Sequence, residues 1–285
     1  MSKLISLFGY PLKHSISPQF QQAALDYCSI QARYVIKATP ADKLEKEVEN
    51  LRTGSYIGAN VTIPYKEVIC SMVDVLDSNA KTVGAVNTIV KEGSKLIGYN
   101  TDGYGFVRSL EERAGFNLTG KSVLMLGAGG AARSAAFAMA NKNVGSLLIA
   151  NRTLDRAESL ANVILPRISK VEAISLEKAR ELSFEADLIV NATSIGMNYS
   201  LTENDTPLKS YEISPSSLVY DMVYTPRMTA LMSVAKNSGA KVLGGLWMLI
   251  YQGASAFNLW TNKEAPIEIM YKAGLQALEF DNALK

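Results

Sequence analysis

The sequence contains little histidine, little cysteine and no long apolar run. Its 285 residues include one histidine, His14, and two cysteines, Cys28 and Cys70. The cysteines are far apart and have no second Cys or His nearby, so neither a zinc site nor a disulfide framework is indicated, and no metal is expected. We expect both thiols to be reduced and buried. No apolar run approaches the roughly 20 residues of a membrane-spanning helix.

The sequence also lacks an excess of charge of either sign. Its 29 Lys and Arg and 27 Asp and Glu give a formal net charge of +2, and the basic residues are interspersed with acidic ones. This balance gives no electrostatic reason to bind nucleic acid or a membrane. The stretch "MSKLISLFGYP" is apolar for only a few residues before Gly9, which is too short for a signal peptide. We expect a cytoplasmic protein that is a monomer or a homodimer.

What the sequence does contain is an alternation of apolar strands and helical segments. This order is typical of an α/β fold with a parallel sheet and helices on both faces, and the length suggests two domains. Two helical stretches follow the last predicted strand. We therefore predict a discontinuous first domain, residues 1–101 completed by 246–285, whose C-terminal helices pack back on it. A second domain is predicted over residues 102–245.

Within the first domain, each element is predicted from the periodicity of its apolar residues and from the turn-forming residues between elements. Strands are expected at 3–9, 33–38 and 56–63, helices at 19–29, 41–52 and 65–76, and two strands around a glycine-containing turn within 85–100.

The stretch "LMLGAGGAARS" joins an apolar strand to an alanine-rich helix through a glycine-rich turn. In dinucleotide-binding folds the first glycine permits the tight turn, the second lets the pyrophosphate approach the backbone, and the phosphates lie on N–H groups at the helix N-terminus. Ala132 stands in the place of the third glycine. A close-packed turn without a ligand is the alternative interpretation. The expected dinucleotide contacts are Gly127, Ala128, Gly129, Gly130 and Ala131.

The end of the next predicted strand favours NADP over NAD. NAD enzymes usually carry an Asp or Glu about twenty residues after the glycine turn, where it binds the ribose 2′-hydroxyl. Here "LLIANRT" offers Asn151, Arg152 and Thr153, and Arg156 follows one helical turn later. No carboxylate is there to repel a 2′-phosphate, and two guanidinium groups can bind it. A solvated helix start is the alternative interpretation.

The stretch "KHSISP" does not indicate a Ser/His nucleophile. Such a hydrolase needs a base beside its nucleophile, whereas His14 directly precedes Ser15 and no G-x-S-x-G elbow occurs. For hydride transfer, the acid/base is then expected among Lys and Asp. Candidates follow predicted strands: Lys66 in "GANVTIPYK" and Asp102 in "GYNTDGYG". A solvated lysine and a helix N-cap remain the alternative interpretations.

The ordered motifs resemble those of the shikimate dehydrogenase family. They are "GYPLKHSISP", "GANVTIPYK", "GAVNT", "GYNTDGYG", "GAGGAARS", "NRT", "NATSIGM", "DMVYTP" and "LIYQGA", and they run from residue 9 to about residue 262. The resemblance implies a two-domain α/β enzyme, with an N-terminal α/β substrate domain and a Rossmann-type NADP-binding domain. It also implies reversible reduction of 3-dehydroshikimate to shikimate with NADPH, on the pathway to chorismate and aromatic amino acids.

Carried over by position, the resemblance also implies roles for individual residues. Lys66 and Asp102 match the catalytic pair, and Ser15 and Ser17 match the pair that binds the substrate carboxylate, with His14 structural. The implied substrate contacts are Ser15, Ser17, Thr62, Asn87, Asp102, Tyr224 and Gln252. The implied cofactor contacts are Gly127 to Ala131, Asn151 to Arg156, Met222 and Gly245, with Asn191 and Thr193 in a motif near the cofactor ribose.

Four residues depart from the family's pattern. Gln21 and Gln22 stand where many members carry His-Asn, and Trp247 and Asn262 stand where glycine is frequent. These departures concern the shape of the subsites, so a quinate/shikimate dehydrogenase is the nearest alternative. A non-catalytic ligand sensor on the same fold and a folate-linked dehydrogenase of similar architecture are further alternatives.

Overall fold

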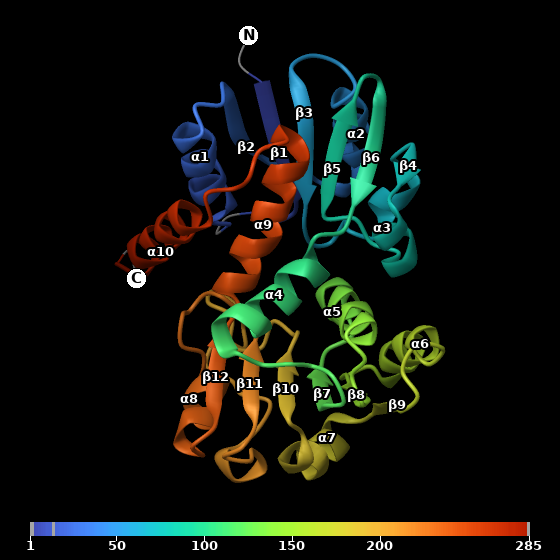
Figure 1. The fold of residues 1–285 in the computed structure, drawn as a ribbon, viewed down its shortest axis with the longest axis vertical. Helices are drawn as coiled ribbons and strands as arrows, with labels where there is room; N and C mark the ends of the chain where they lie inside the picture. Colours follow the sequence, from blue (N-terminus) through green and yellow to red (C-terminus); the bar gives the residue numbers. More distant parts are fainter. Residues whose placement is uncertain (1–2, 13–14, 284–285) are drawn as a thin grey trace. The chain divides into compact units, whose positions relative to one another are not determined.

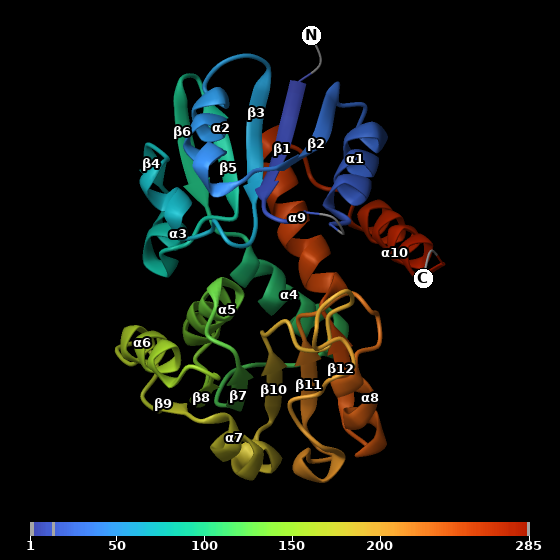
Figure 2. The same ribbon diagram turned by 180° about the vertical axis from the view of Figure 1, so that it is seen from behind.

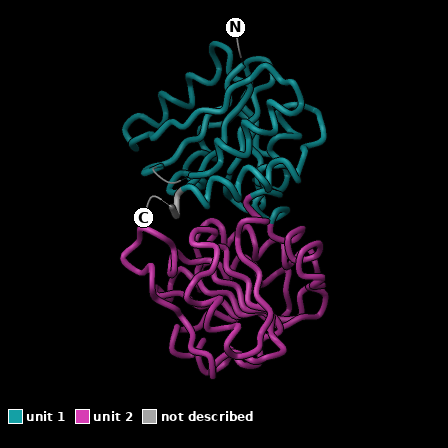
Figure 3. The backbone as a smooth tube through the Cα atoms, turned by 90° about the vertical axis from the view of Figure 1, so that its left-hand side faces the viewer, with its two compact units in different colours: residues 1–105, 250–285 teal, residues 106–249 magenta. Residues whose placement is uncertain are grey.

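The computed structural model describes residues 3–12 and 15–283. The chain divides into two compact units, Met1–Gly105 with Ile250–Lys285, and Phe106–Leu249 (Figure 3). The functional boundaries predicted from the sequence stay predictions. No helix in the described ranges is long and apolar enough to cross a membrane.

Two helices run from one unit into the other. They are α4 (Asp102–Ala114) and α9 (Leu246–Thr261). Asp102 therefore lies at the first turn of a helix whose remaining turns belong to the second unit.

The first unit contains a six-stranded sheet in the spatial order β2-β1-β3-β5-β6-β4 (Figure 1). Its strands are β1 (Lys3–Gly9), β2 (Ala32–Ala38), β3 (Tyr56–Val61), β4 (Val75–Leu76), β5 (Thr88–Glu92) and β6 (Lys95–Tyr99). The element order predicted a parallel sheet, but β5 runs antiparallel to both β3 and β6. A two-residue connection, Gly93 and Ser94, joins β5 to β6 as a hairpin, and such short connections require antiparallel strands.

The helices of the first unit include the C-terminal helix of the chain. They are α1 (Ser17–Tyr27), η1 (Ala41–Lys43), α2 (Leu44–Asn50), η2 (Val68–Ser71), α3 (Ser78–Val83) and α10 (Ile267–Ala283), where η denotes a 3-10 helix. Helix α10 packs on α1 (Figure 1). The prediction that the C-terminal helices pack back on the first domain is confirmed. Cys28 and Cys70 are half-buried free thiols, less buried than expected.

The helix predicted over residues 65–76 is wrong. The chain there forms η2 and then the short strand β4, which pairs with β6. The N–H of Asp74 donates to the carbonyl of Leu96, and the carboxylate of Asp74 accepts the N–H of Leu96 at 2.7 Å. These bonds hold Asp74 against β6, so the following residues pair as a strand. The β-branched residues of this stretch have low helix propensity, so little helix stability is lost when the strand forms.

The second unit contains six parallel strands in the spatial order β12-β11-β10-β7-β8-β9 (Figure 2). This is the order of a Rossmann-type sheet, in which the strand order reverses beside the first strand. The strands are β7 (Ser122–Leu126), β8 (Ser146–Ala150), β9 (Val171–Ile174), β10 (Leu188–Asn191), β11 (Leu218–Asp221) and β12 (Lys241–Gly244). The intervening helices are α5 (Gly130–Asn141), α6 (Leu154–Ile164), α7 (Leu176–Leu182), η3 (Ser183–Glu185), η4 (Ser210–Glu212) and α8 (Ala230–Asn237).

The core of the second unit lies between its central strands and helices α7 and α8. Leu124, Ile189 and Val219 contribute fully buried side chains from three adjacent strands, and Ala179 and Leu231 pack on them from the helices. Strands β10 and β11 are buried at all of their residues. This continuous burial is characteristic of a parallel sheet covered on both faces, and it leaves the strand ends as the places for polar function.

Candidate active site

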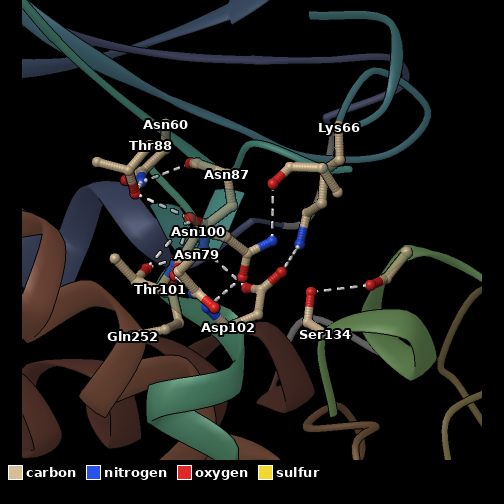
Figure 4. A network of polar contacts seen from close by, with 12 residues as sticks. Asn60, Lys66, Asn79, Asn87, Thr88, Asn100, Thr101, Asp102, Ser134 and Gln252 are labelled. Carbon is tan, nitrogen blue, oxygen red and sulfur yellow. Dashed lines mark hydrogen bonds and ion pairs between the residues drawn. The ribbon is translucent and has the colours of Figure 1, made fainter. Parts of the chain in front are cut away.

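The first unit brings Lys66, Asn87 and Asp102 together at one edge of its sheet (Figure 4). Asn87 immediately precedes β5. Because β5 runs antiparallel between its neighbours, its beginning lies beside the ends of β3 and β6: Thr88 pairs with Asn60 of β3. The predicted meeting of polar groups at one sheet edge therefore occurs, but through the start of an antiparallel strand.

Lys66 and Asp102 form a partly buried ion pair. The Nζ of Lys66 lies 2.6 Å from the Oδ2 of Asp102, and their side chains are 17% and 6% exposed. Lys66 lies in the turn between β3 and η2, so its predicted place at an α-helix start is wrong. The carboxylate of Asp102 bonds to Lys66 and Asn87 and does not act as a simple helix cap. Its position in the first turn of α4 also favours negative charge.

The Asn87 side chain, 2% exposed, holds the neighbouring groups in place. Its Nδ2 donates to the Oδ1 of Asp102 at 2.8 Å, to the Oγ1 of Thr101 at 2.9 Å and to the Oε1 of Gln252 at 3.1 Å. Its Oδ1 accepts the N–H of Thr101 and the hydroxyl of Thr88. Both ends of the amide are thus used, which fixes its orientation. Gln252, on α9 within the first unit, belongs to the cluster through this bond, and its role as a substrate contact stays a prediction.

The other residues predicted for this unit lie near the ends of its first elements. The Oγ of Ser15 accepts the N–H of Ser17 at 3.3 Å, and Ser17 begins α1. Thr62 follows β3, and its N–H donates to the carbonyl of Phe8. In the described part of the chain, none of these three residues is hydrogen-bonded to the Lys66–Asp102 pair. Lys13 and His14, which the sequence analysis discussed, lie outside the described residues.

The sequence analysis missed two contributors to this cluster, Tyr34 and Thr88. The hydroxyl of Tyr34 donates to the Oδ1 of Asn60 at 2.7 Å, and the Nδ2 of Asn60 donates to the Oγ1 of Thr88 at 3.2 Å. Tyr34 lies inside β2 and Thr88 begins β5, and both are buried like core residues. Asn60 at the end of β3 was the available signal, because a buried amide requires partners.

The residues that depart from the family's pattern are accommodated locally. The Nε2 of Gln21 donates to the carbonyl of Gly253 on α9 at 3.0 Å. The Oε1 of Gln22 accepts a backbone N–H of β2. The indole of Trp247 stacks on the guanidinium of Arg113, 3.4 Å from the ring centroid. Asn262 has a φ of 53°, the left-handed region in which glycine is favoured and asparagine is tolerated.

The glycine-rich turn of the second unit fits a dinucleotide phosphate. Gly127 has a φ of 111°, and a Cβ there would lie 2.9 Å from the carbonyl oxygen of Ala192. Gly129 caps α5 without a side chain, and a Cβ there would meet nothing within 4 Å. Ala128 lies between them, and Gly130 and Ala131 begin the twelve-residue helix. The helix therefore presents its N-terminal N–H groups beside open space, as phosphate binding requires.

The end of β8 carries exposed positive charge. The Nδ2 of Asn151 donates to the carbonyl of Thr153 at 2.8 Å, which closes the turn into α6. Arg152 and Arg156 are exposed, and neither is paired with a carboxylate of the described residues. The two guanidinium groups are thus available to an anion at the position where a 2′-phosphate is expected.

The predicted residues Met222, Tyr224 and Gly245 also lie in the second unit. Met222 and Tyr224 follow β11, and Gly245 follows β12. The N–H of Gly245 donates to the carbonyl of Val223 at 3.2 Å. A Cβ on Gly245 would overlap the carbonyl oxygen of Met222. The structure therefore brings Gly245 and Met222 into contact, and only glycine fits there.

A second buried aspartate, Asp221, ends β11. Its carboxylate accepts hydrogen bonds from the Nδ2 of Asn191, the N–H of Val223 and the hydroxyl of Thr229. Burial raises the pKa of Asp221 to about 6, against the lowering effect of these three bonds. The Oδ1 of Asn191 in turn accepts the hydroxyl of Thr193 at 2.6 Å. Asp221 therefore links the loops that follow β10 and β11.

Together these features define a two-domain α/β protein of the dinucleotide-binding class. Three family models match it: "Shikimate dehydrogenase substrate binding domain" over residues 7–89, "Shikimate / quinate 5-dehydrogenase" over 109–223, and "Shikimate 5'-dehydrogenase C-terminal domain" over 245–273.

Several proteins to which the chain is similar are shikimate dehydrogenases. The chain is 40% identical to a shikimate dehydrogenase (NADP(+)) of Methanopyrus kandleri, over 97% of this chain and 96% of that one. It is 42% identical to one of Moorella thermoacetica, over 96% and 93%. The solved shikimate 5-dehydrogenase of Thermus thermophilus, in complex with NADP(H) and shikimate, has a TM-score of 0.87 at 33% identity, over 97% and 100%. The chain belongs to the shikimate dehydrogenase family, and the predicted family and fold class are confirmed.

Proposed function

We propose that this chain catalyses the reversible, NADPH-dependent reduction of 3-dehydroshikimate to shikimate. The observation that carries the proposal is the partly buried Lys66–Asp102 pair, in the unit that matches the family's substrate-binding domain. Reduction of a ketone to an alcohol needs one proton at the oxygen, and an ammonium group can donate it. In this pair the ammonium group of Lys66 is partly shielded from solvent, and the carboxylate of Asp102 balances its charge.

In the proposed mechanism Lys66 is the general acid of reduction and the general base of oxidation. The Nζ of Lys66 donates a proton to the substrate oxygen as negative charge develops there, a role that contributes typically about 10²–10⁴-fold. Asp102 accepts a hydrogen bond from Nζ at 2.6 Å and thereby holds the ammonium in position. In the reverse direction Nζ removes the proton from the hydroxyl.

Asn87, Asp102 and Gln252 are proposed to orient the substrate ring. Their side chains are already joined through the Nδ2 of Asn87, so a substrate hydroxyl would meet preorganised oxygen and nitrogen atoms. Such preorganisation lowers the entropy lost when the reacting groups are aligned. Thr62 and Tyr224 are further proposed contacts. Ser15 and Ser17, two hydroxyls at alternate residues, are proposed to bind the substrate carboxylate.

NADP is proposed to bind at the carboxyl edge of the second unit's sheet. The N–H groups that follow Gly129 bind the pyrophosphate, and Arg152 and Arg156 bind the 2′-phosphate. The bound NADPH supplies the hydride. Met222 and Gly245, which are in contact with each other, are proposed to contact the cofactor from the ends of β11 and β12.

One assay tests the proposal. Purified protein is mixed with shikimate or quinate and with NADP or NAD, and nicotinamide absorbance is followed. We expect the highest kcat/KM with shikimate and NADP. Comparable rates with quinate would favour a quinate/shikimate dehydrogenase, and the absence of turnover in every combination would contradict an enzymatic function.

Location and assembly complete the proposal. The two free thiols suit a reducing compartment, so we place the protein in the cytoplasm, as a monomer or a homodimer. Fractionation of cells and sedimentation of the purified protein check these two statements.

A further inference from the structure

Tyr34 is a buried tyrosine whose hydroxyl is used by the polar cluster of the first unit. The residue lies in β2 and is 6% exposed. Its ring lies 6.4 Å from that of Trp260, at 56° between the ring planes. Its hydroxyl donates to the Oδ1 of Asn60 at 2.7 Å. A buried phenol with a short hydrogen bond to an amide oxygen fixes which way that amide points.

From Asn60 the hydrogen bonds run in one direction toward Asp102 (Figure 4). The Nδ2 of Asn60 donates to the Oγ1 of Thr88 at 3.2 Å and to the carbonyl of Asn87 at 3.0 Å. The hydroxyl of Thr88 donates to the Oδ1 of Asn87 at 3.0 Å. The Nδ2 of Asn87 then donates to the Oδ1 of Asp102 at 2.8 Å. Each of Asn60, Thr88 and Asn87 thus accepts from the group before it and donates to the next.

The Tyr34 hydroxyl is the first donor of this chain of bonds. Burial raises the pKa of Tyr34, so the phenol keeps its proton and donates it to Asn60 at 2.7 Å. One buried hydroxyl therefore lies at the start of the bonds that lead to Asp102.

We propose that Tyr34 is a positioning residue that helps to hold the carboxylate of Asp102 in place through Asn60, Thr88 and Asn87. The inference rests on the proposed function, because Asp102 there holds the Lys66 ammonium and orients the substrate. Misplacement of such a group by about 1 Å is enough to slow a reaction substantially.

The test is Tyr34→Phe, which keeps the ring against Trp260 and removes only the hydroxyl. Asn60 then loses the donor to its buried Oδ1, and its amide is held only by the bonds of its Nδ2 to Asn87 and Thr88. We expect kcat/KM for shikimate to fall by about tenfold, through both KM and kcat, with NADPH affinity unchanged. The matched control is Tyr220→Phe, since Tyr220 is also fully buried and its hydroxyl bonds to Ser109 at 2.8 Å, away from the cluster.

Both variants lose one buried hydroxyl and should lose similar thermal stability. If Tyr34→Phe changes stability but leaves kcat and KM like those of Tyr220→Phe, Tyr34 is only structural and the proposal is overturned. Thr88→Val provides a second test in case Tyr34→Phe does not fold, because it breaks the same chain of bonds one step closer to Asp102. Wild-type kcat and KM from this Thr88 variant would also overturn the proposal.

A double-mutant cycle separates coupling from independent effects. Combined with Thr88→Val, Tyr34→Phe should reduce kcat/KM by clearly less than it does alone, because the chain of bonds is already broken at Thr88. Additive losses would show that Tyr34 does not act through Thr88 and would overturn the proposal. All comparisons are made relative to the wild-type rate on shikimate. An inactive wild type would contradict the proposed function, whereas an active wild type with unaffected Tyr34 and Thr88 variants would contradict only the role of Tyr34.

Discussion

Each unit buries an aspartate at the end of a strand or just after it, and the two aspartates have opposite kinds of partner. Asp102 in the first unit lies 2.6 Å from the ammonium of Lys66. Asp221 in the second unit accepts from Asn191, Val223 and Thr229, which are all neutral. No cationic side chain of the described residues pairs with Asp221.

In the proposed function, this difference separates a carboxylate that takes part in the reaction from one that holds loops together. A buried charge is costly unless it is paired, and the Lys66 ammonium balances the charge of Asp102 while it presents a proton. Asp221 has only neutral donors, so its ionised form is disfavoured by burial, and the pKa is raised to about 6. What Asp221 supplies is three hydrogen bonds that join the loops after β10 and β11. We expect substitutions at the first site to alter rate and those at the second to alter stability.

The largest effect is expected for Lys66→Met. This change removes the proton and the charge but keeps much of the stem's bulk. We expect kcat to fall by about 10²-fold or more, with a much smaller change in substrate KM, because the lost interaction develops in the transition state. Steady-state kinetics measure the effect, and circular dichroism checks the fold.

The matched control is Lys121→Met, since Lys121 also pairs with an aspartate, Asp187, at 3.0 Å, but on the surface of the second unit. It should leave kcat within about twofold, because exposed pairs contribute little. A folded Lys66→Met enzyme that retains more than about a tenth of the wild-type kcat would remove Lys66 from the mechanism.

The next effect is on stability and concerns the pH dependence that Asp221 causes. Since the folded-state pKa of Asp221 is raised to about 6, the folded protein binds this proton more tightly than the unfolded chain does. Stability from this group is therefore fully present below about pH 4 and is lost as the pH rises to about 6. Asp221→Asn should gain up to about 3 kcal/mol relative to wild type between about pH 4 and pH 7. Denaturant unfolding across this range measures the gain.

Asp187→Asn is the control, and the opposite dependence of stability on pH is expected for it. A backbone hydrogen bond from Ser122 and the Lys121 partner lower the pKa of Asp187, so the stability it contributes is lost as the pH falls. Wild type should therefore lose its advantage over this variant in acid. If Asp221→Asn and Asp187→Asn showed the same pH trend, the contrast between a carboxylate with neutral donors and one with a cation would be wrong.

The sequence predicted the elements whose signals are local. The glycine turn at Gly127 and the strands of the second unit can be recognised from the residues of those segments alone. Roles could be assigned to Lys66 and Asp102 from the resemblance to the family. The antiparallel direction of β5 had a local signal in the glycine-containing turn predicted within residues 85–100, although the element order favoured a parallel sheet. The strand β4 could not be predicted, because it depends on pairing between distant segments, such as Asp74 with Leu96, which leaves no periodicity in either segment. Tyr34 was missed for the same reason.

The smallest effect is expected after β8 in the second unit, where the exposed side chains of Arg152 and Arg156 carry positive charge. An exposed arginine without a carboxylate partner contributes little to folding, so Arg152→Gln should keep the wild-type stability. A hydrogen bond to a charged group is worth roughly 1.5–3 kcal/mol, so NADPH binding should weaken about ten- to a hundredfold. NADH lacks the 2′-phosphate, and its affinity should hardly change. Fluorescence titration of both nucleotides measures this difference, with Arg33→Gln, an exposed arginine of the first unit, as the control. Equal losses for NADPH and NADH would mean that Arg152 supports the loop after β8 and does not bind the phosphate.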